Sequence, residues 1–314
     1  MPTASVCIVT YNSAKDIESC LEAVLKQTFP VESIVVIDNA STDGTAERVT
    51  RYSKQVQFIA NEVNNGFAGG QNQAIRQTRS DYVLVLNPDV TIEPNYLFEI
   101  ISFMEQDKAV GSATGQLVFS SNKDVMDSAG LGMKRTRNVF DLGAGEPVSN
   151  WNSKQAVFGV SGAAAVYRTT MIRDIEFEGE FFDEQFFAYK EDVDVAWRAQ
   201  TLGWKSYYFP SAKAVHHRGW KKGGRSSIPL FVRQHSYQNR FFTLLKNESI
   251  GWHSIVIGPY ILATEVIKLG YIVLREPGLL HCWPTILRSF PKMLKKRRWV
   301  KTKAKQNKGK SKSI

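Results

Sequence analysis

The sequence predicts an α/β fold, with a Rossmann-like, mostly parallel sheet flanked by helices and a C-terminal helical extension. Over the first 110 residues, short β-branched runs alternate with segments whose apolar residues have helical spacing. Strands that alternate with helices pair in parallel through right-handed crossovers. Polar, small or acidic residues follow each run, and ligands bind such sheets beyond the carboxyl ends of the strands. The first half of the chain is therefore expected to carry a ligand site.

Four apolar runs predict strands buried on both faces, with amphipathic helices between them. The run SVCIVT ends at Thr10, and a helix is expected from about Ser13. The other expected strands are 33–37, 56–60 and 82–86, and the other expected helices are 46–52, 69–78 and 93–106. Later in the chain we expect a helix that opens at Glu191, a strand over 205–210 and a helix over 230–246.

The chain divides into three expected parts. Residues 1–225 form a main domain with halves at 1–110 and 111–225, residues 226–290 form a helical region, and residues 291–314 form a basic, disordered tail.

An apolar segment in the helical region, residues 252–274, is long enough to cross a bilayer of about 30 Å as a helix. Pro259, Glu265 and Lys268 interrupt it, and charges are costly at the centre of a bilayer. We therefore favour a helix that packs on the protein or lies on the membrane over one that spans it. The basic tail would be attracted to an anionic membrane surface, and the alternative is a solvated tail.

The formal net charge of +10 comes from the end of the chain. From residue 277 onward there are 12 Lys or Arg and no Asp or Glu, which leaves 40 − 12 = 28 basic against 30 acidic residues before it. A near-neutral body argues against a nucleic-acid-binding domain, although a tail that grips phosphates stays open as an alternative. Cys7, Cys20 and Cys282 lack the CxxC spacing of a disulfide or zinc framework, and the N-terminus lacks the pattern of a cleaved signal. A reducing, cytoplasmic location is expected.

Two strand-end acids are candidates for ligand binding. Asp38 follows a strand and can accept hydrogen bonds from a base or ribose, whereas Asp43 either binds ligand or caps the next helix. The glycine-rich segment NNGFAGGQN either allows close approach of a phosphate or is an ordinary loop. These candidates predict a nucleotide site at the strand ends.

A divalent cation site is expected at Asn87-Pro88-Asp89, which follows the run YVLVL. Mg²⁺ is often held by one or two protein oxygens plus substrate phosphates, so Asp89 needs few partners. His216 or His217, at the end of a late strand, could supply another ligand, or both histidines could be structural. Glu191, Asp192 and Asp194 open a helix, where carboxylates either stabilise the helix dipole or act as a general base.

Six motifs in order resemble glycosyltransferase family 2, and in particular its bacterial rhamnosyltransferase-like branch. They cover about residues 4–225 and read VCIVTYNSAKDIESCLEAVLKQT, VVIDNASTDGT, NNGFAGGQNQAI, VLVLNPDV, FDEQFFAYKEDVDVAWRAQTLGW and VHHRG. The resemblance implies a GT-A fold in which 1–110 is a nucleotide-sugar half and 111–225 an acceptor half. It also implies an inverting transfer that depends on Mg²⁺ or Mn²⁺.

The resemblance assigns roles to individual residues. Asp192, next to Glu191, matches the catalytic base, and Asp89 with His216 or His217 matches the metal site. Asn87 stands where the family has the first acid of its DXD motif, which removes one charge from the metal shell. The residues that would line the nucleotide and sugar are Thr10, Tyr11, Asn12, Asp38, Asn65, Gly66, Asn72 and Asn87.

The expected substrates follow from the same branch. The donor is a nucleoside-diphosphate sugar, with dTDP-rhamnose favoured, and the acceptor is a glycan or polyprenyl-linked sugar in the synthesis of cell-wall or other surface polysaccharide. We expect the enzyme at the inner face of the cell membrane. The competing hypotheses are a non-catalytic sugar-nucleotide-binding protein and a nucleic-acid-binding protein that uses the basic tail.

Overall fold

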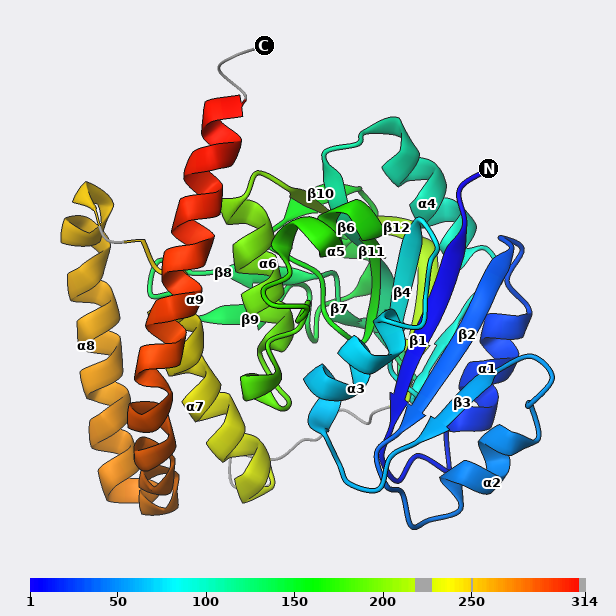
Figure 1. The fold of residues 1–314 in the computed structure, drawn as a ribbon, viewed down its shortest axis with the longest axis horizontal. Coiled ribbons are helices and arrows are strands. Elements are labelled where there is room, and N and C mark those ends of the chain that lie inside the picture. The colour runs from blue at the N-terminus through cyan, green and yellow to red at the C-terminus, as the bar shows by residue number, and fades with distance from the viewer. Residues whose placement is uncertain (218–227, 250, 311–314) are drawn as a thin grey trace.

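The computed structural model describes residues 1–217, 228–249 and 251–310 (Figure 1). The first half alternates strands and helices as expected. Its elements are β1 Ala4–Thr10, α1 Ile17–Leu25, β2 Val31–Asp38, α2 Thr45–Thr50, β3 Gln57–Ala60, α3 Gly66–Ile75, β4 Tyr82–Leu86, β5 Val90–Ile92 and α4 Tyr96–Gln106.

The second half is richer in short strands. Its elements are β6 Val110–Phe119, β7 Asn122–Ser128, β8 Leu131–Met133, β9 Val139–Asp141, β10 Gln155–Val157, β11 Ala164–Arg168, α5 Thr169–Ile175, α6 Glu191–Thr201 and β12 Lys205–His216. The expected helix at Glu191 and the strand that begins at Lys205 are both present.

Ten strands form one sheet in the order β10-β12-β6-β11-β4-β1-β2-β3, with β5 on β12 and β7 on β6. The strands β4, β1, β2 and β3 run parallel, and β6 runs parallel to β12. The strand β11 is antiparallel to both β4 and β6 and joins these two parallel groups. The expected Rossmann-like, mostly parallel sheet is therefore confirmed.

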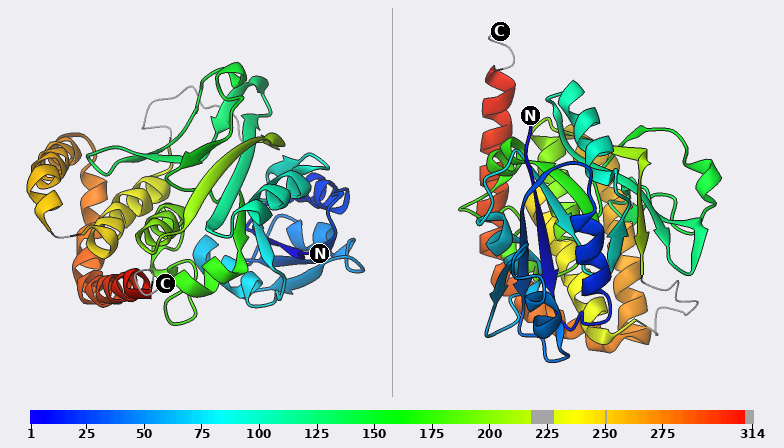
Figure 2. Two further views of the ribbon diagram at one scale, coloured as in Figure 1. Left: turned by 90° about the horizontal axis from the view of Figure 1, so that it is seen from above. Right: turned by 90° about the vertical axis from the view of Figure 1, so that its right-hand side faces the viewer.

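Helices cover both faces of the sheet (Figures 1 and 2). Alternate residues of β1 point to opposite faces, as the two-residue period of a strand requires. Val6 and Ile8 pack in one apolar cluster with α1 and α4, while Cys7 packs in another with α3, α5 and α6. This double coverage explains why the strands read as continuous apolar runs.

Three long helices complete the chain: α7 Leu230–Asn247, α8 Trp252–Arg275 and α9 Trp283–Lys310. A separate apolar cluster joins them to Phe186 of the second half, with Phe242 of α7 and Met293 of α9 among its members. Within the region 291–314, where a disordered tail is expected, the structure has α9 as far as Lys310, and this helix buries Met293 and Val300. Residues 311–314, and the domain boundary expected at 225, lie outside the described residues.

Candidate active site

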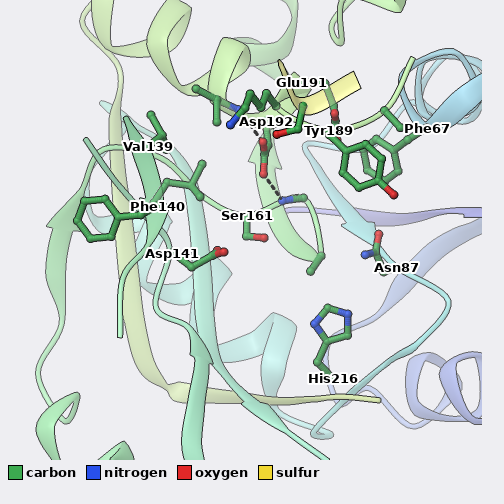
Figure 3. A pocket seen from close by; sticks show the side chains of 17 residues that line it. Phe67, Asn87, Val139, Phe140, Asp141, Ser161, Tyr189, Glu191, Asp192 and His216 are labelled. Atoms are coloured by element: carbon green, nitrogen blue, oxygen red, sulfur yellow. Dashed lines mark hydrogen bonds between the residues drawn. The ribbon is translucent and has the colours of Figure 1, made fainter. Parts of the chain in front are cut away.

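Two neighbouring cavities lie at the carboxyl ends of the central strands, and Figure 3 shows the first of them. The first cavity, of about 450 Å³, is lined by Asn87, Asp141, Glu191, Asp192 and His216 among others. The second cavity, of about 520 Å³, is lined by residues that include Val9, Tyr11 and Asn64. Phe67, Asn87, Ala188 and Tyr189 line both cavities, so the two cavities are direct neighbours.

An acidic pair at the start of α6 faces the first cavity. The Asp192 carboxylate accepts hydrogen bonds from Val193 N at 2.7 Å and from Gly162 N at 3.3 Å. Burial nevertheless raises the pKa of Asp192, which increases the proton affinity of its carboxylate. A positioned carboxylate with raised proton affinity can act as a general base.

Glu191 lies next to Asp192 and is buried. Burial, together with the neighbouring charge of Asp192, raises the pKa of Glu191 to about 8. Its Oε2 has no hydrogen-bond partner among the described residues. Because two adjacent buried carboxylates do not ionise together easily, Glu191 is the one expected to keep its proton at neutral pH.

The segment before this pair has an unusual backbone. Phe187, Tyr189 and Lys190 all have positive φ angles of 60° to 71°, a conformation that costs energy in residues other than glycine. Asn239 of α7 compensates, because its Nδ2 donates to the carbonyl oxygens of Phe186, Ala188 and Tyr189 at 2.7 to 2.9 Å. A buried side chain from the C-terminal helices thus fixes the loop that carries the acidic pair.

His216 lines the first cavity, and Asp89 lies next to His216. His216 Nε2 lies 3.2 Å from Asp89 Oδ1, and its Nδ1 lies 2.7 Å from Oδ2 of Asp127 on β7. Asp127 is buried, and its carboxylate accepts a hydrogen bond from a protonated Nδ1. Nε2 is then the ring atom that faces Asp89, and it can bind a cation when it carries no proton. His217 is turned away, with its Nε2 3.2 Å from Thr91 Oγ1.

The donor set of Asp89 and His216 fits a divalent cation. No cluster of three or more metal-binding side chains occurs within residues 1–217, 228–249 and 251–310. An imidazole nitrogen and a carboxylate oxygen suit Mn²⁺, and two protein ligands are enough when substrate phosphates complete the shell. The carboxylate that orients the histidine through its other nitrogen is a common feature of such sites.

On the nucleotide side, the structure brings only part of the expected set to a cavity wall. Tyr11 and Gly66 line the second cavity and Asn87 lines both. Asp38 and Thr10 are buried next to each other, where the Asp38 carboxylate accepts hydrogen bonds from Thr10 Oγ1 and from Ser41. A direct contact between Asp38 and a base stays a prediction.

Asn12 and Asp43 hold loops together. Asn12 Oδ1 accepts from Thr42 N at 2.9 Å, which joins the loops after β1 and β2. Asp43 accepts from Thr45 N at 3.1 Å and from Ala14 N at 3.0 Å. The local, structural alternative for Asp43 therefore has direct support.

Asn72 makes hydrogen bonds within the protein. It is buried, and its amide exchanges hydrogen bonds with the backbone of Phe182, at 2.7 Å to the carbonyl and 2.9 Å from the N–H. These hydrogen bonds link α3 to the segment that precedes α6, and a contact between Asn72 and the nucleotide or sugar stays a prediction. Asn65 is exposed next to Gly66 and lines neither cavity.

The glycine-rich segment forms part of a closely packed helix and is not an open loop. Its glycines lie in the first turns of α3, which begins at Gly66. A Cβ on Gly66 would lie 2.5 Å from Phe187 O, and one on Gly70 would lie 2.8 Å from Val9 Cγ1. The glycines therefore let α3 closely approach β1 and the loop of residues 187–190 that precedes the acidic pair, called the acidic loop below.

Buried charges attach α6 to the C-terminal helices. Asp194 accepts from Arg198 and Lys246, at 2.9 and 2.8 Å. Lys246 also donates to Asp183 at 2.8 Å, and Lys296 of α9 donates to the other oxygen of Asp183. Burial raises the pKa values of Asp183 and Asp194, but the neighbouring cations outweigh it and hold both below their ordinary range. Of the three acids at the start of α6, Asp194 is therefore structural.

The family model "Glycosyl transferase family 2" matches residues 5–175. The chain belongs to glycosyltransferase family 2. This glycosyltransferase is 27% identical over 270 residues to the N-acetylglucosaminyl-diphospho-decaprenol L-rhamnosyltransferase of Mycobacterium tuberculosis, an alignment that covers 79% of this chain and 85% of the relative. It is 24% identical over 210 residues to the poly-β-1,6-N-acetyl-D-glucosamine synthase of Staphylococcus epidermidis, with 66% of this chain and 48% of that one covered.

Solved structures share the fold of this glycosyltransferase. TarS residues 1–349 of S. aureus has a TM-score of 0.59 at 17% identity, covering 98% of this chain and 89% of that one. A mannosyltransferase of Pyrobaculum calidifontis in complex with GDP-Man and Mn²⁺ has a TM-score of 0.57 at 17% identity, covering 98% and 87%. GalNAc-T7 with UDP, GalNAc and Mn²⁺ has a TM-score of 0.63 at 13% identity, covering 78% and 49%. The GT-A fold expected from the sequence is confirmed.

Proposed function

We propose that this glycosyltransferase transfers rhamnose from dTDP-rhamnose, with inversion at the anomeric carbon, to a lipid-linked or glycan acceptor in the synthesis of a cell-wall or surface polysaccharide. The observation that carries the proposal is one cavity that joins Asp192 to Asn87 and His216, in a chain related along most of its length to a rhamnosyltransferase. The synthase from Staphylococcus is a relative with a different sugar in its name, so the donor is the part of the proposal that most needs a direct test.

Asp192 would accept the proton of the acceptor hydroxyl. The hydroxyl oxygen would then form a bond to the anomeric carbon as the bond between that carbon and the nucleoside diphosphate breaks on the opposite face. A single displacement of this kind inverts the configuration. The two backbone N–H groups that bind Asp192 orient its carboxylate, and burial gives it the proton affinity of a base. Glu191 would stay protonated next to Asp192 and so limit the negative charge in the cavity.

Asp89 and His216 would hold Mn²⁺ or Mg²⁺ next to the diphosphate. When bound there, a divalent cation would neutralise the charge that develops on the departing diphosphate. Asn87 lines both cavities and would contact the donor without adding charge. Tyr11 and Gly66 would line the nucleotide in the second cavity.

Asp192→Asn tests the catalytic role. Since the amide cannot accept the proton but has almost the same shape, turnover should fall by a factor of about 10² or more with donor binding nearly unchanged. Asp124→Asn is the matched control, because Asp124 is an exposed carboxylate of β7 outside both cavities. Normal turnover by Asp192→Asn would place the base elsewhere.

A panel of nucleotide sugars tests the donor. A ligand that binds only the folded protein raises its apparent stability, so the melting temperature should rise most with dTDP-rhamnose, and only when Mn²⁺ or Mg²⁺ is present. A larger rise with UDP-N-acetylglucosamine would overturn the rhamnose assignment and leave the transferase assignment intact. A full rise in the presence of a chelator would overturn the metal dependence.

We also propose that the enzyme works at the inner face of the cell membrane. Among the described residues, one helix segment, Ile255–Arg275, is long and apolar enough to cross a bilayer. Only 11% of its most apolar 18-residue stretch is buried in the protein. Support for a membrane location comes from this segment, from the basic C-terminal region and from the lipid-linked acceptor in the name of the mycobacterial relative.

A further inference from the structure

Helix α8 has its apolar residues on the outside. It lies at the edge of the molecule farthest from β2 and β3 (Figures 1 and 2). At 3.6 residues per turn, its exposed apolar side chains share a broad outer face. They are Ile255, Val256, Tyr260, Leu262, Val266, Ile267, Leu269, Tyr271, Val273 and Leu274, exposed by 38% to 80%.

The two charged residues inside α8 point toward the protein instead. Glu265 accepts from Arg240 Nε at 2.7 Å, and Lys268 Nζ donates to Asn138 Oδ1 at 2.7 Å. Ile257 and Ile272, on the same inner face, are buried. This arrangement is the reverse of a soluble surface helix, which turns its charged face to water. The charges that interrupt the apolar run in the sequence therefore do not interrupt the outer face of the helix.

The start of α9, which follows α8 in the chain, also carries exposed apolar residues and adds positive charge. Leu287 and Phe290 are exposed by 64% and 42%, and the intervening Arg288 and the nearby Lys292 are exposed as well. The region from residue 277 onward has 12 Lys or Arg and no acidic residue. An exposed apolar face this large on a soluble protein marks an interaction site, and basic side chains beside it match an anionic surface.

We propose that α8 lies in the plane of an anionic lipid bilayer, with its outer face among the acyl chains and the basic side chains of α9 on the headgroups. Tyr260 and Tyr271 fit such a position, because tyrosine favours the boundary between lipid and water. The helix does not span, because Glu265 and Lys268 lie in its middle and are held by Arg240 of α7 and by Asn138 of the main domain.

The attachment reaches the wall of the first cavity. Asn138 lies in the turn between β8 and β9, and Arg240 donates to the carbonyl oxygens of Thr136 and Arg137 in that turn. The β8–β9 hairpin lines the first cavity through Leu131, Val139, Phe140 and Asp141. On the proposed function, the acceptor side of the active site is thereby fixed relative to the membrane, which suits an acceptor anchored in the same lipid.

Vesicle flotation of the full-length protein tests the proposal. The wild type should float with vesicles that contain phosphatidylglycerol, and less with pure phosphatidylcholine or at high salt. The double variant Leu262→Glu/Ile267→Glu places two carboxylates on the outer face, and its partition to anionic vesicles should fall by about ten-fold or more. The matched control is Leu25→Glu/Phe98→Glu, which changes two exposed apolar residues of α1 and α4 and should float like the wild type.

Three results would overturn the proposal. The first is equal flotation of the α8 double variant and the wild type. The second is a wild-type dimer in analytical ultracentrifugation that the α8 variant converts to a monomer, with no vesicle binding by either, which would assign the face to a second copy of this chain. The third is retention in host membranes after alkaline carbonate extraction, which would show a span.

The test separates this proposal from the proposed function. Stabilisation by nucleotide sugars is measured without lipid and should be the same in the wild type and the α8 variant. Loss of vesicle binding with normal donor binding would remove only the membrane proposal. Normal vesicle binding with no response to any nucleotide sugar would contradict only the proposal that the two cavities bind the sugar donor.

Discussion

Asp127 is predicted to control metal affinity although it lines neither cavity. Its carboxylate lies 2.7 Å from His216 Nδ1, and both side chains are buried. Replacement Asp127→Asn keeps an oxygen that can accept the Nδ1 proton but removes the charge that strengthens this hydrogen bond. Changes to carboxylates that orient metal-binding histidines cost about 10- to 100-fold in metal affinity, or about 1.4 to 2.7 kcal/mol. Asp127→Ala, which also frees the ring to rotate, should lie at the upper end of this range.

The assay is the titration of free Mn²⁺ by electron paramagnetic resonance in the presence of a nucleoside diphosphate. It reports binding without any turnover, and circular dichroism of each variant shows whether it is folded. Asp124→Asn, on the same strand but exposed, is the matched control and should bind Mn²⁺ like the wild type. The positive controls are Asp89→Asn and His216→Ala, which should abolish binding.

Two outcomes would contradict this reasoning. If Asp127→Asn and Asp127→Ala both bind Mn²⁺ with wild-type affinity while His216→Ala does not, Asp127 has no positioning role. If Asp89→Asn and His216→Ala also bind normally, the metal site lies elsewhere.

Three further predictions concern the acidic loop and its supports. Asn239→Ala removes the donor shared by three carbonyl oxygens, so kcat should fall by about ten-fold or more with little change in nucleotide affinity. An unchanged kcat would show that the loop keeps its conformation without Asn239. Lys246→Met should lower the urea unfolding free energy by about 3 kcal/mol at pH 7, because Asp183 and Asp194 lose a buried cation. Because the pKa values of these acids are lowered in the folded protein, their ionisation stabilises the fold above about pH 4, and this stabilisation is lost as the pH falls further. The variant should therefore lose less unfolding free energy in acid than the wild type. Equal losses would refute the linkage. Glu191, whose pKa is raised to about 8, makes unfolding easier as the pH rises from about 4.5 to 8, and Glu191→Gln should flatten that slope.

The sequence predicts the sheet well because its signals are local. A run such as YVLVL at β4 can be recognised without knowing its neighbours, since strands covered on both faces need apolar residues throughout. The start of α6 at Glu191 was predictable for a similar reason, because acidic residues favour a helix N-terminus. The antiparallel β11 was not predictable, because nothing in its small residues shows that it separates two parallel groups.

The candidate site is predicted less completely because its supports come from distant parts of the chain. His216 and Asp89 could be proposed from their strand ends, but Asp127 lies 89 residues before His216 in an irregular stretch without a motif. Asn72 belongs to a family motif, yet its amide pairs with the backbone of Phe182, 110 residues away. A motif identifies which residues are constrained, and only the packing shows whether the constraint comes from a ligand or from the fold.

The C-terminal helices support the loop that carries Glu191 and Asp192 and the helix that follows it. Composition separates them from the body because they carry the basic excess, and this led to the expectation of a disordered tail. Yet Asn239 and Lys246 of α7 are buried against the acidic loop and α6, and Lys296 of α9 reaches Asp183. Without these helices, three residues with positive φ before Asp192 would lose the donor that holds them, and Asp194 would be buried with fewer cations. The basic C-terminal region is therefore not only a solvated tail, because Lys246 and Lys296 are buried against Asp183 and Asp194 and hold α6 in place.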